Sequence, residues 1–253
     1  MRLFLVALQF LTRLPVRLNR FQPGWLNDCV RHFPLVGTLV GAVGAAVLLG
    51  AAHFWPAWIA AVLALAATVA LTGGFHEDGL ADTLDALGGV VSRDRALTIM
   101  KDSRIGSYGA LALALSLLLR AALLAVLATR PALMAAAALL ASHAFARAAA
   151  VGVMVSLPYG GDAEHAKAKP LALAVAPRNF VIALSWCGLL ALALACAGVY
   201  PPRLAAAMCA ACAVAVLMRR WLKRRLGGYT GDGLGATEQF AEMAVLLAFT
   251  ASV

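Results

Sequence analysis

Long apolar stretches alternate with short polar ones along most of this 253-residue chain. A run of roughly 20 apolar residues is long enough to cross a bilayer as an α-helix. The pattern predicts an all-α, polytopic membrane bundle of about six or seven transmembrane helices, formed by residues 1–253 as a single integral membrane domain. The expected spans are residues 34–54, 56–74, 108–127, 131–155, 180–199, 204–218 and 236–253.

The first fifteen residues, MRLFLVALQFLTRLP, differ from these runs because they are short and carry Arg2 and Arg13 near their ends. Such a segment is typical of an amphipathic helix that lies in the membrane interface. A short first span is the alternative interpretation. The segment lacks the long apolar region and the small-residue cleavage site of a cleavable signal peptide.

Basic residues are distributed unevenly between the two sides of the predicted bundle. Of the 21 Lys and Arg, 17 lie in the N-terminal segment and in three loops on the same side, whereas only Arg130 and Arg203 lie in the opposite loops. Because loops rich in Lys and Arg stay in the cytoplasm, that side is predicted to be cytoplasmic. The net charge of +9 does not indicate nucleic-acid binding, since no basic and aromatic groove pattern accompanies it.

Several polar or reactive side chains fall inside the apolar runs. Cys209 and Cys212 form a CxxC pair, but they lie in an apolar run, where a free cysteine behaves as a small hydrophobic residue. Arg120 lies near the middle of a span, which snorkelling, a shifted span boundary or a function would each explain. His143 and Arg147 are one helical turn apart, so both could contact an anionic substrate or make a structural hydrogen bond.

Four of the 12 acidic residues are concentrated in nine positions of the segment GGFHEDGLADTLDALGG. This segment is expected to be helical after Gly79, and Asp78, Asp82 and Asp85 then fall on one face. Like charges at this spacing destabilise a helix unless a cation lies between them, and Mg²⁺ prefers such oxygen ligands. The segment therefore predicts a magnesium site held by the three aspartates, with His76 as a general base, a ligand or a helix cap. A solvated acidic loop is the alternative.

Two further polar segments are predicted on the same side of the membrane. RDRALTIMKDSRIGSYG contains the donors Lys101, Ser103 and Arg104, which suit phosphate oxygens. GGYTGDGLGATEQ places several glycines near Thr230 and Asp232 just before a helix, where backbone amides can bind anions. It is not a Walker A loop, because no Lys-Ser/Thr pair follows the glycines. The three segments together predict metal-assisted chemistry on a phosphate substrate.

These three segments are similar to the signature segments of the cobalamin synthase family, which is also called adenosylcobinamide-GDP ribazoletransferase. LQFLTRLPV and RHFPLVGTLVGA resemble the opening of that family, so the resemblance runs nearly end to end. It implies an integral, Mg²⁺-dependent enzyme of the bacterial inner membrane that acts late in cobalamin biosynthesis. Such an enzyme joins adenosylcobinamide-GDP to α-ribazole, or to α-ribazole 5′-phosphate, and releases GMP. A homo-oligomer is compatible with this interpretation.

The resemblance also carries roles onto individual residues. Asp82 is expected to be the most essential carboxylate and, with His76, catalytic, while Asp78 and Asp85 would share the metal with Asp82. Glu77 departs from the family pattern, because an apolar residue is commoner there, and the segment GGDAEHAKAKPLA is less similar to many members. Through the family's motifs, Lys101, Asp102, Ser103, Arg104, Thr230 and Asp232 are expected to contact the substrates. Arg147 is added from its position one helical turn after His143.

Two other classes of protein share parts of this pattern. A CDP-alcohol phosphatidyltransferase also places aspartates at helical spacing in a membrane, but Asp82 stands where its motif has an arginine. A cation-coupled transporter would place carboxylates near the middle of the membrane, often within inverted repeats. The acids of this chain are expected in a long cytoplasmic segment, and the sequence shows no internal repeat.

Overall fold

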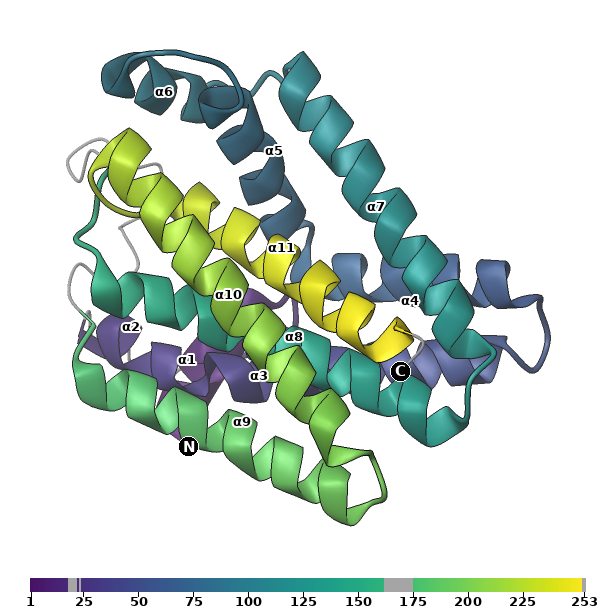
Figure 1. Cartoon of the computed structure of the whole chain (residues 1–253). Coiled ribbons are helices and arrows are strands. Elements are labelled where there is room, and N and C mark those ends of the chain that lie inside the picture. Colours follow the sequence, from purple (N-terminus) through teal and green to yellow (C-terminus); the bar gives the residue numbers. More distant parts are fainter. Residues whose placement is uncertain (18–21, 23, 162–174, 252–253) are drawn as a thin grey trace.

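The computed structural model of the protein describes residues 1–17, 22, 24–161 and 175–251. These residues form helices packed into one bundle (Figure 1), and an isolated parallel bridge joins Tyr159 to Tyr229. In chain order the helices are α1 (Arg2–Leu11), α2 (Gly24–Cys29), the 3₁₀ helix η1 (Val30–His32), α3 (Phe33–Ala51), α4 (Ala57–Thr72), α5 (Phe75–Leu87), α6 (Arg93–Met100), α7 (Ser107–Ala128), α8 (Ala132–Ser156), α9 (Pro177–Cys196), α10 (Pro201–Leu226) and α11 (Gly231–Thr250).

Five helical segments of the described chain are long and apolar enough to cross a membrane. They are the continuous segment Gly24–Ala51, which contains α3, and helices α7, α8, α9 and α10. Helices α4 and α5 would together form a sixth span, but they are bent by 88° at the break between them. Gly73 and Gly74 form this break with φ values of 73° and 70°, a conformation that glycine adopts without steric cost. The prediction of a polytopic all-α bundle is therefore confirmed.

The expectation that the acidic segment becomes helical only after Gly79 is wrong. Helix α5 begins at Phe75, so Gly79 lies inside the helix. The first turn of α5 is also inside the bundle, because His76 is 4% exposed and Glu77 is 8% exposed. The two-glycine break explains the difference, since it ends α4 early and lets a new helix start among the other spans. The acidic segment is therefore a helix whose first turn lies inside the bundle, and not only a loop.

Helix α8 lies at the centre of the bundle. Its most apolar window is 83% buried, against 22% for the corresponding windows of α9 and α10. Helix α3 packs closely on α8, because a Cβ atom at Gly37 or Gly41 would overlap backbone carbonyl groups of α8. Small residues allow such close approach between membrane helices. The alanine-rich sequence of α8 and the glycines of α3 together build this contact.

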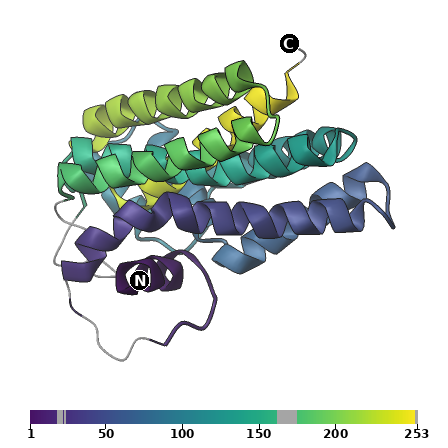
Figure 2. The same cartoon turned by 90° about the horizontal axis from the view of Figure 1, so that it is seen from below.

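Helix α1 lies beside α3 on the outside of the bundle, and Figure 2 shows it nearly end-on, so the two helices run crosswise. Its ten residues would reach only about 15 Å, about half of the hydrocarbon thickness. Val6, Leu8 and Leu11 are buried against the neighbouring helices. This length and packing favour the interfacial interpretation over a short span.

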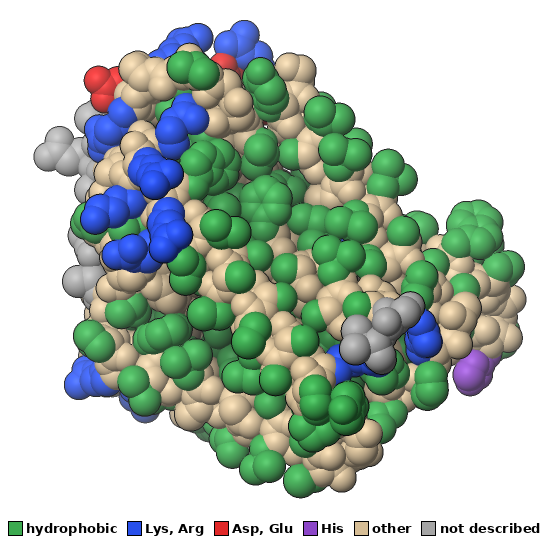
Figure 3. All heavy atoms as spheres, in the orientation of Figure 1, with side chains coloured by type: hydrophobic (Ala, Val, Ile, Leu, Met, Phe, Trp, Pro, Cys, Tyr) green, Lys and Arg blue, Asp and Glu red, His purple; other side chains and the backbone are tan. Residues whose placement is uncertain are grey.

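One end of the bundle gathers much of the basic surface. Figure 3 shows Lys and Arg side chains grouped over the end where α6 and the C-terminus of α10 lie. Helix α10 continues well past the expected end at Met218, and its last turn carries Lys223, Arg224 and Arg225. Cations in the last turn stabilise a helix through its dipole, which explains the longer helix. The loop around Lys167 lies outside the described residues.

Candidate functional site

The acidic helix and the C-terminal helix cross each other at two glycines. A Cβ atom at Gly79 of α5 would lie 2.9 Å from the carbonyl oxygen of Asp232 and 3.1 Å from the Cα atom of Gly235. This contact brings the acidic segment next to the first turn of α11, which belongs to the glycine-rich segment. Glycines were expected to mark close backbone approaches, and Gly79 confirms this.

The three aspartates of α5 lie in different surroundings. Asp78 is exposed, and Asp82 is half-buried one turn further along. Asp85 accepts hydrogen bonds from the backbone N–H groups of Gly106 at 2.7 Å and of Gly109 at 2.8 Å. Its carboxylate therefore caps the N-terminus of α7, where backbone N–H groups have no partner within the helix. This contact gives Asp85 a structural role that the sequence did not indicate.

The second polar segment forms α6 and the loop that leads into α7. In this loop the Arg104 guanidinium donates to both carboxylate oxygens of Asp102, with Nε to Oδ1 at 3.0 Å and Nη2 to Oδ2 at 2.6 Å. The hydrogen bond and charge of Asp102 raise the pKa of Arg104 above its ordinary value. Lys101, Ser103 and Arg104 are all exposed. The loop therefore presents donors to solvent, with the arginine oriented by its neighbour.

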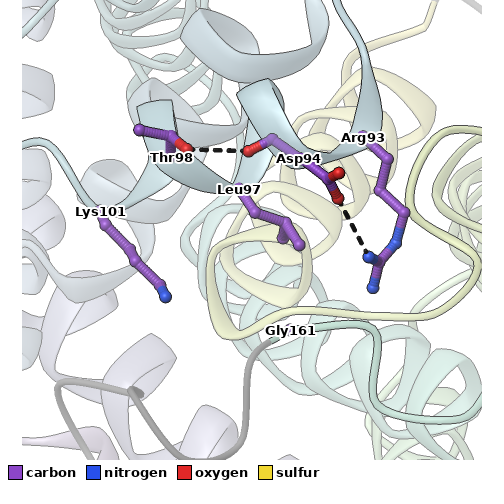
Figure 4. A pocket seen from close by; sticks show the side chains of 6 residues that line it. All are labelled: Arg93, Asp94, Leu97, Thr98, Lys101 and Gly161. Carbon is purple, nitrogen blue, oxygen red and sulfur yellow. Dashed lines mark hydrogen bonds and ion pairs between the residues drawn. The ribbon is translucent and has the colours of Figure 1, made fainter.

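An open pocket of about 500 Å³ lies beside this loop. Figure 4 shows Lys101 and Arg93 on opposite sides of the pocket, with Leu97 between them. Arg93 Nε donates to the carbonyl oxygen of Leu226 at 2.9 Å, and its Nη2 donates to that of Gly160 at 2.8 Å. Arg93 thus ties α6 to two distant segments, and Lys101 supplies a second positive charge at the pocket.

The glycine-rich segment starts α11. Thr230 is the N-cap of this helix, because its hydroxyl accepts a hydrogen bond from the N–H of Gly233 at 3.1 Å. The same hydroxyl lies 3.8 Å from the sulfur of Met100 in α6. Burial, with a smaller effect of Tyr159, raises the pKa of Tyr229, the residue before Thr230, to about 12. All three polar segments therefore meet at one end of the bundle.

A network of buried charged side chains lies behind the acidic face of α5. Arg120 of α7 pairs with Glu77 of α5 and with Glu242 of α11, each at 2.8 Å. Arg147 Nη1 of α8 lies 2.7 Å from Glu238 Oε1 of α11, and His76 Nε2 contacts the other oxygen of Glu238. The cavity lined by these groups is about 10 Å³, which is too small for a phosphate. Gln239 and His143 complete the network.

Three sequence expectations are affected by this network. Arg147 is 1% exposed and paired with Glu238, so its position does not support the predicted contact with an anionic substrate. His76 is also paired inward, which does not support a role as general base. Arg120 is 2% exposed and does not snorkel, because its guanidinium meets two carboxylates inside the bundle.

Sequence reasoning missed three members of the network, namely Glu238, Gln239 and Glu242, and the pairing between the helices. Glu238 and Glu242 stand in an apolar helix, and ionisable groups within membrane segments usually face a protein interior. That signal was available, but their partners lie on other helices, far away in sequence. Glu77 was regarded only as a fourth acid of the acidic segment.

Among the described residues, three possible metal ligands have donor atoms within 4.8 Å of one another, namely His143, Glu238 and Glu242. A metal ion fits this group poorly. The guanidinium of Arg147 already lies against Glu238, and that of Arg120 lies against Glu242. A cation placed there would be repelled by two arginines, so the buried group is better described as an ion-pair network.

The fold and the site define a polytopic helical membrane protein with acidic and cationic groups gathered at one end. The sequence model of the family described as cobalamin-5-phosphate synthase matches residues 3–250. The chain belongs to this family. No solved structure matches the chain.

Curated relatives extend over the full length of the chain. It is 51% identical over all 253 residues to the adenosylcobinamide-GDP ribazoletransferase of Leptothrix cholodnii, of which 96% is covered. It is 44% identical over 248 residues to the protein of the same name from Shewanella amazonensis, covering 98% of this chain and 94% of the relative. A third relative of that name, from Albidiferax ferrireducens, is 42% identical, with 97% of this chain and 96% of the relative covered.

Proposed function

We propose that this chain is an adenosylcobinamide-GDP ribazoletransferase that works at the cytoplasmic face of the bacterial inner membrane. The full-length similarity to relatives of that name supports the activity. The observation that carries the proposal is the crossing of α5 and α11 at Gly79 and Gly235, which puts the acidic segment beside the glycine-rich one. The cationic loop of the second segment lies at the same end.

In the proposed reaction, a hydroxyl group of α-ribazole, or of its 5′-phosphate, attacks the phosphorus that bears cobinamide. A new P–O bond forms, the P–O bond to the GMP leaving group breaks, and the hydroxyl loses its proton. Such a transfer depends on positioning and on neutralisation of charge. Lys101 and Arg104, which are exposed beside the acidic helix, are the groups that we propose to hold the phosphates.

The carboxylates near the α5–α11 crossing are donors of the type that Mg²⁺ requires. Asp78 is exposed, and Asp82 of α5 and Asp232 of α11 are half-buried near the contact of Gly79 with the Asp232 backbone. These are hard oxygen donors of the kind that Mg²⁺ shares with substrate phosphates. We propose that Asp78 and Asp82 hold the ion, with Asp232 beside them, because Asp85 is engaged in capping α7. Bound Mg²⁺ would neutralise charge on the pyrophosphate.

Purified protein in lipid nanodiscs, given adenosylcobinamide-GDP, α-ribazole and Mg²⁺, is expected to release GMP. Parallel reactions with α-ribazole 5′-phosphate would show which acceptor is preferred. The Asp82→Asn protein is the control for contaminating activity. Absence of GMP release from folded protein with both acceptors would refute the proposal, and turnover of a CDP-alcohol instead would support the phosphatidyltransferase alternative.

The proposed orientation can be tested separately in intact cells. In a variant without native cysteines, a cysteine at Ser92, next to the acidic segment, should resist a membrane-impermeant thiol reagent. A cysteine at His53, in the exposed turn after α3, should react. The reverse pattern would place the site outside the cytoplasm.

A further inference from the structure

Helix α11 contacts α5 through a stripe of residues spaced three or four apart. Gly235 packs on Gly79, Glu238 contacts His76, and Gln239 Nε2 lies 3.3 Å from Glu77 Oε1. Residues at this spacing share one helix face. Glu242 continues the stripe and joins α5 indirectly, through Arg120 of α7. The stripe thus holds the first turn of α5 at several points.

The chain before α5 does little to orient it. Gly73 and Gly74 both have positive φ, and a Cβ atom at Gly74 would meet nothing within 4 Å. At Gly73 the nearest atoms all belong to the flexible side chain of Arg13, so the two-glycine turn constrains the rotation and depth of the next helix only weakly. The contacts of α5 itself therefore contribute most to its orientation.

The first turn of α5 has one face that is paired inside the bundle and another that carries a proposed metal ligand. Glu77 points into the network, where its Oε1 accepts from Arg120 Nη1 at 2.8 Å. Asp78, the next residue, is exposed, and successive helical residues point about 100° apart. A rotation of α5 that moves Glu77 therefore moves Asp78 and Asp82 with it.

We propose that Arg120 and Glu77 are positioning residues, whose buried ion pair sets the rotation of α5 and thereby places Asp78 and Asp82. This inference rests on the proposed function, because it assigns the two aspartates to the working site. Arg120 is suited to the role, since its guanidinium also meets Gln239 at 2.8 Å and Glu242 at 2.8 Å on α11. One side chain of α7 thus connects both helices that carry the proposed metal ligands.

A paired apolar replacement separates positioning from folding. Removing one partner of a buried ion pair leaves an uncompensated charge, whereas replacing both with apolar residues of similar volume is often neutral for stability. The double variant Arg120→Met with Glu77→Leu removes this pair without a change of net charge, and of its contacts within the described chain Glu242 then keeps only the one with His143. Its insertion and folding are therefore established first by size-exclusion chromatography and circular dichroism. Its GMP release should fall roughly tenfold or more, because small misplacements of reacting groups are costly. The Mg²⁺ concentration for half-maximal activity should rise.

The conservative variant Glu77→Gln provides the rescue. Its side-chain oxygen can still accept from Arg120 and hold α5 in place, so activity should stay within about threefold of the parent. Arg130→Gln is a matched control, because Arg130 is exposed after the C-terminus of α7. It should leave both turnover and the Mg²⁺ requirement unchanged.

Hydrogen exchange supplies a readout that does not depend on activity. Exchange in α5 of the double variant should quicken by roughly tenfold, while α3, which lies outside the network, keeps its parental rates. A folded double variant with parental turnover and parental α5 exchange would overturn the inference.

If the double variant does not fold, Gln239→Leu replaces it, since it removes one contact to each positioning residue without a charge change. Unchanged turnover, Mg²⁺ requirement and α5 exchange in the folded Gln239→Leu variant would also overturn the inference. Absence of turnover in the parent would instead refute the proposed function.

Discussion

Replacing Gly79 with alanine tests the crossing on which the site depends. The added methyl group would lie 2.9 Å from the carbonyl oxygen of Asp232 and 3.1 Å from the Cα atoms of Asp232 and Gly235. All three neighbours are backbone atoms of α11, so no side chain can rotate away to make room. The two helices must therefore move apart by a few tenths of an ångström or more.

Two opposing effects set the magnitude. Overpacking of a close contact costs about 1–3 kcal/mol, while alanine is favoured over glycine within a helix by about 1 kcal/mol. The free energy of unfolding should therefore fall by about 1 kcal/mol for Gly79→Ala. Activity should fall further than stability, because the separation displaces Asp232 from the acidic helix, and a misplacement of about 1 Å can reduce the rate by about 100-fold.

Gly188→Ala is the matched control. Gly188 lies within α9, and a Cβ atom there would meet nothing within 4 Å, so only the propensity gain remains. Unfolding of both variants in mixed detergent micelles, followed by circular dichroism, gives the two free energies, and GMP release gives the activities. Equal unfolding free energies for the two variants, with parental activity in Gly79→Ala, would refute the close crossing of α5 and α11.

Three further substitutions address the proposed site residues. Asp82→Asn should insert normally and lose roughly 10³-fold in turnover, because it removes a charge that the metal requires; near-parental turnover at low Mg²⁺ would exclude it as a ligand. Arg104→Lys should lower kcat/KM for adenosylcobinamide-GDP by roughly tenfold or more, because lysine cannot form a two-pronged contact with phosphate, and a ratio near one would limit Arg104 to its pairing with Asp102. Asp85→Ala should lower the unfolding free energy by about 0.5–2 kcal/mol through loss of the α7 cap, without changing the Mg²⁺ requirement, and a shifted requirement would restore Asp85 to the metal site.

Apolar run length was sufficient to predict five of the seven expected spans, because a bilayer imposes nearly the same length on every crossing helix. Helix α11, expected as the span 236–253, is not among the described helices that are long and apolar enough to cross. The expected limits of α7 and α8 differ from the observed ones by one residue at each end. The run length failed at α4, where two glycines divide an apolar segment from a polar one. Hydropathy assigns the polar part to a loop. A helix that buries a polar face inside a bundle has the same composition as such a loop, so hydropathy does not distinguish the two. Only the tertiary partners of His76 and Glu77 reveal which of the two is present.

The sequence indicates which residues belong to the buried network more readily than it indicates which of them pair with each other. Arg120 and Arg147 on one side, and Glu238 and Glu242 on the other, are opposite charges in apolar helices, and lipid offers them no other partner. Their pairing spans up to 122 residues, from Arg120 to Glu242, so no local periodicity records it. Glu77 is the least predictable member, because the family pattern that the sequence resembles more often has an apolar residue at this position. Since Arg120 uses that acid directly, the two residues form one unit. A relative with an apolar residue in place of Glu77 is therefore expected to orient its Arg120 counterpart toward α11 alone, or to lack it.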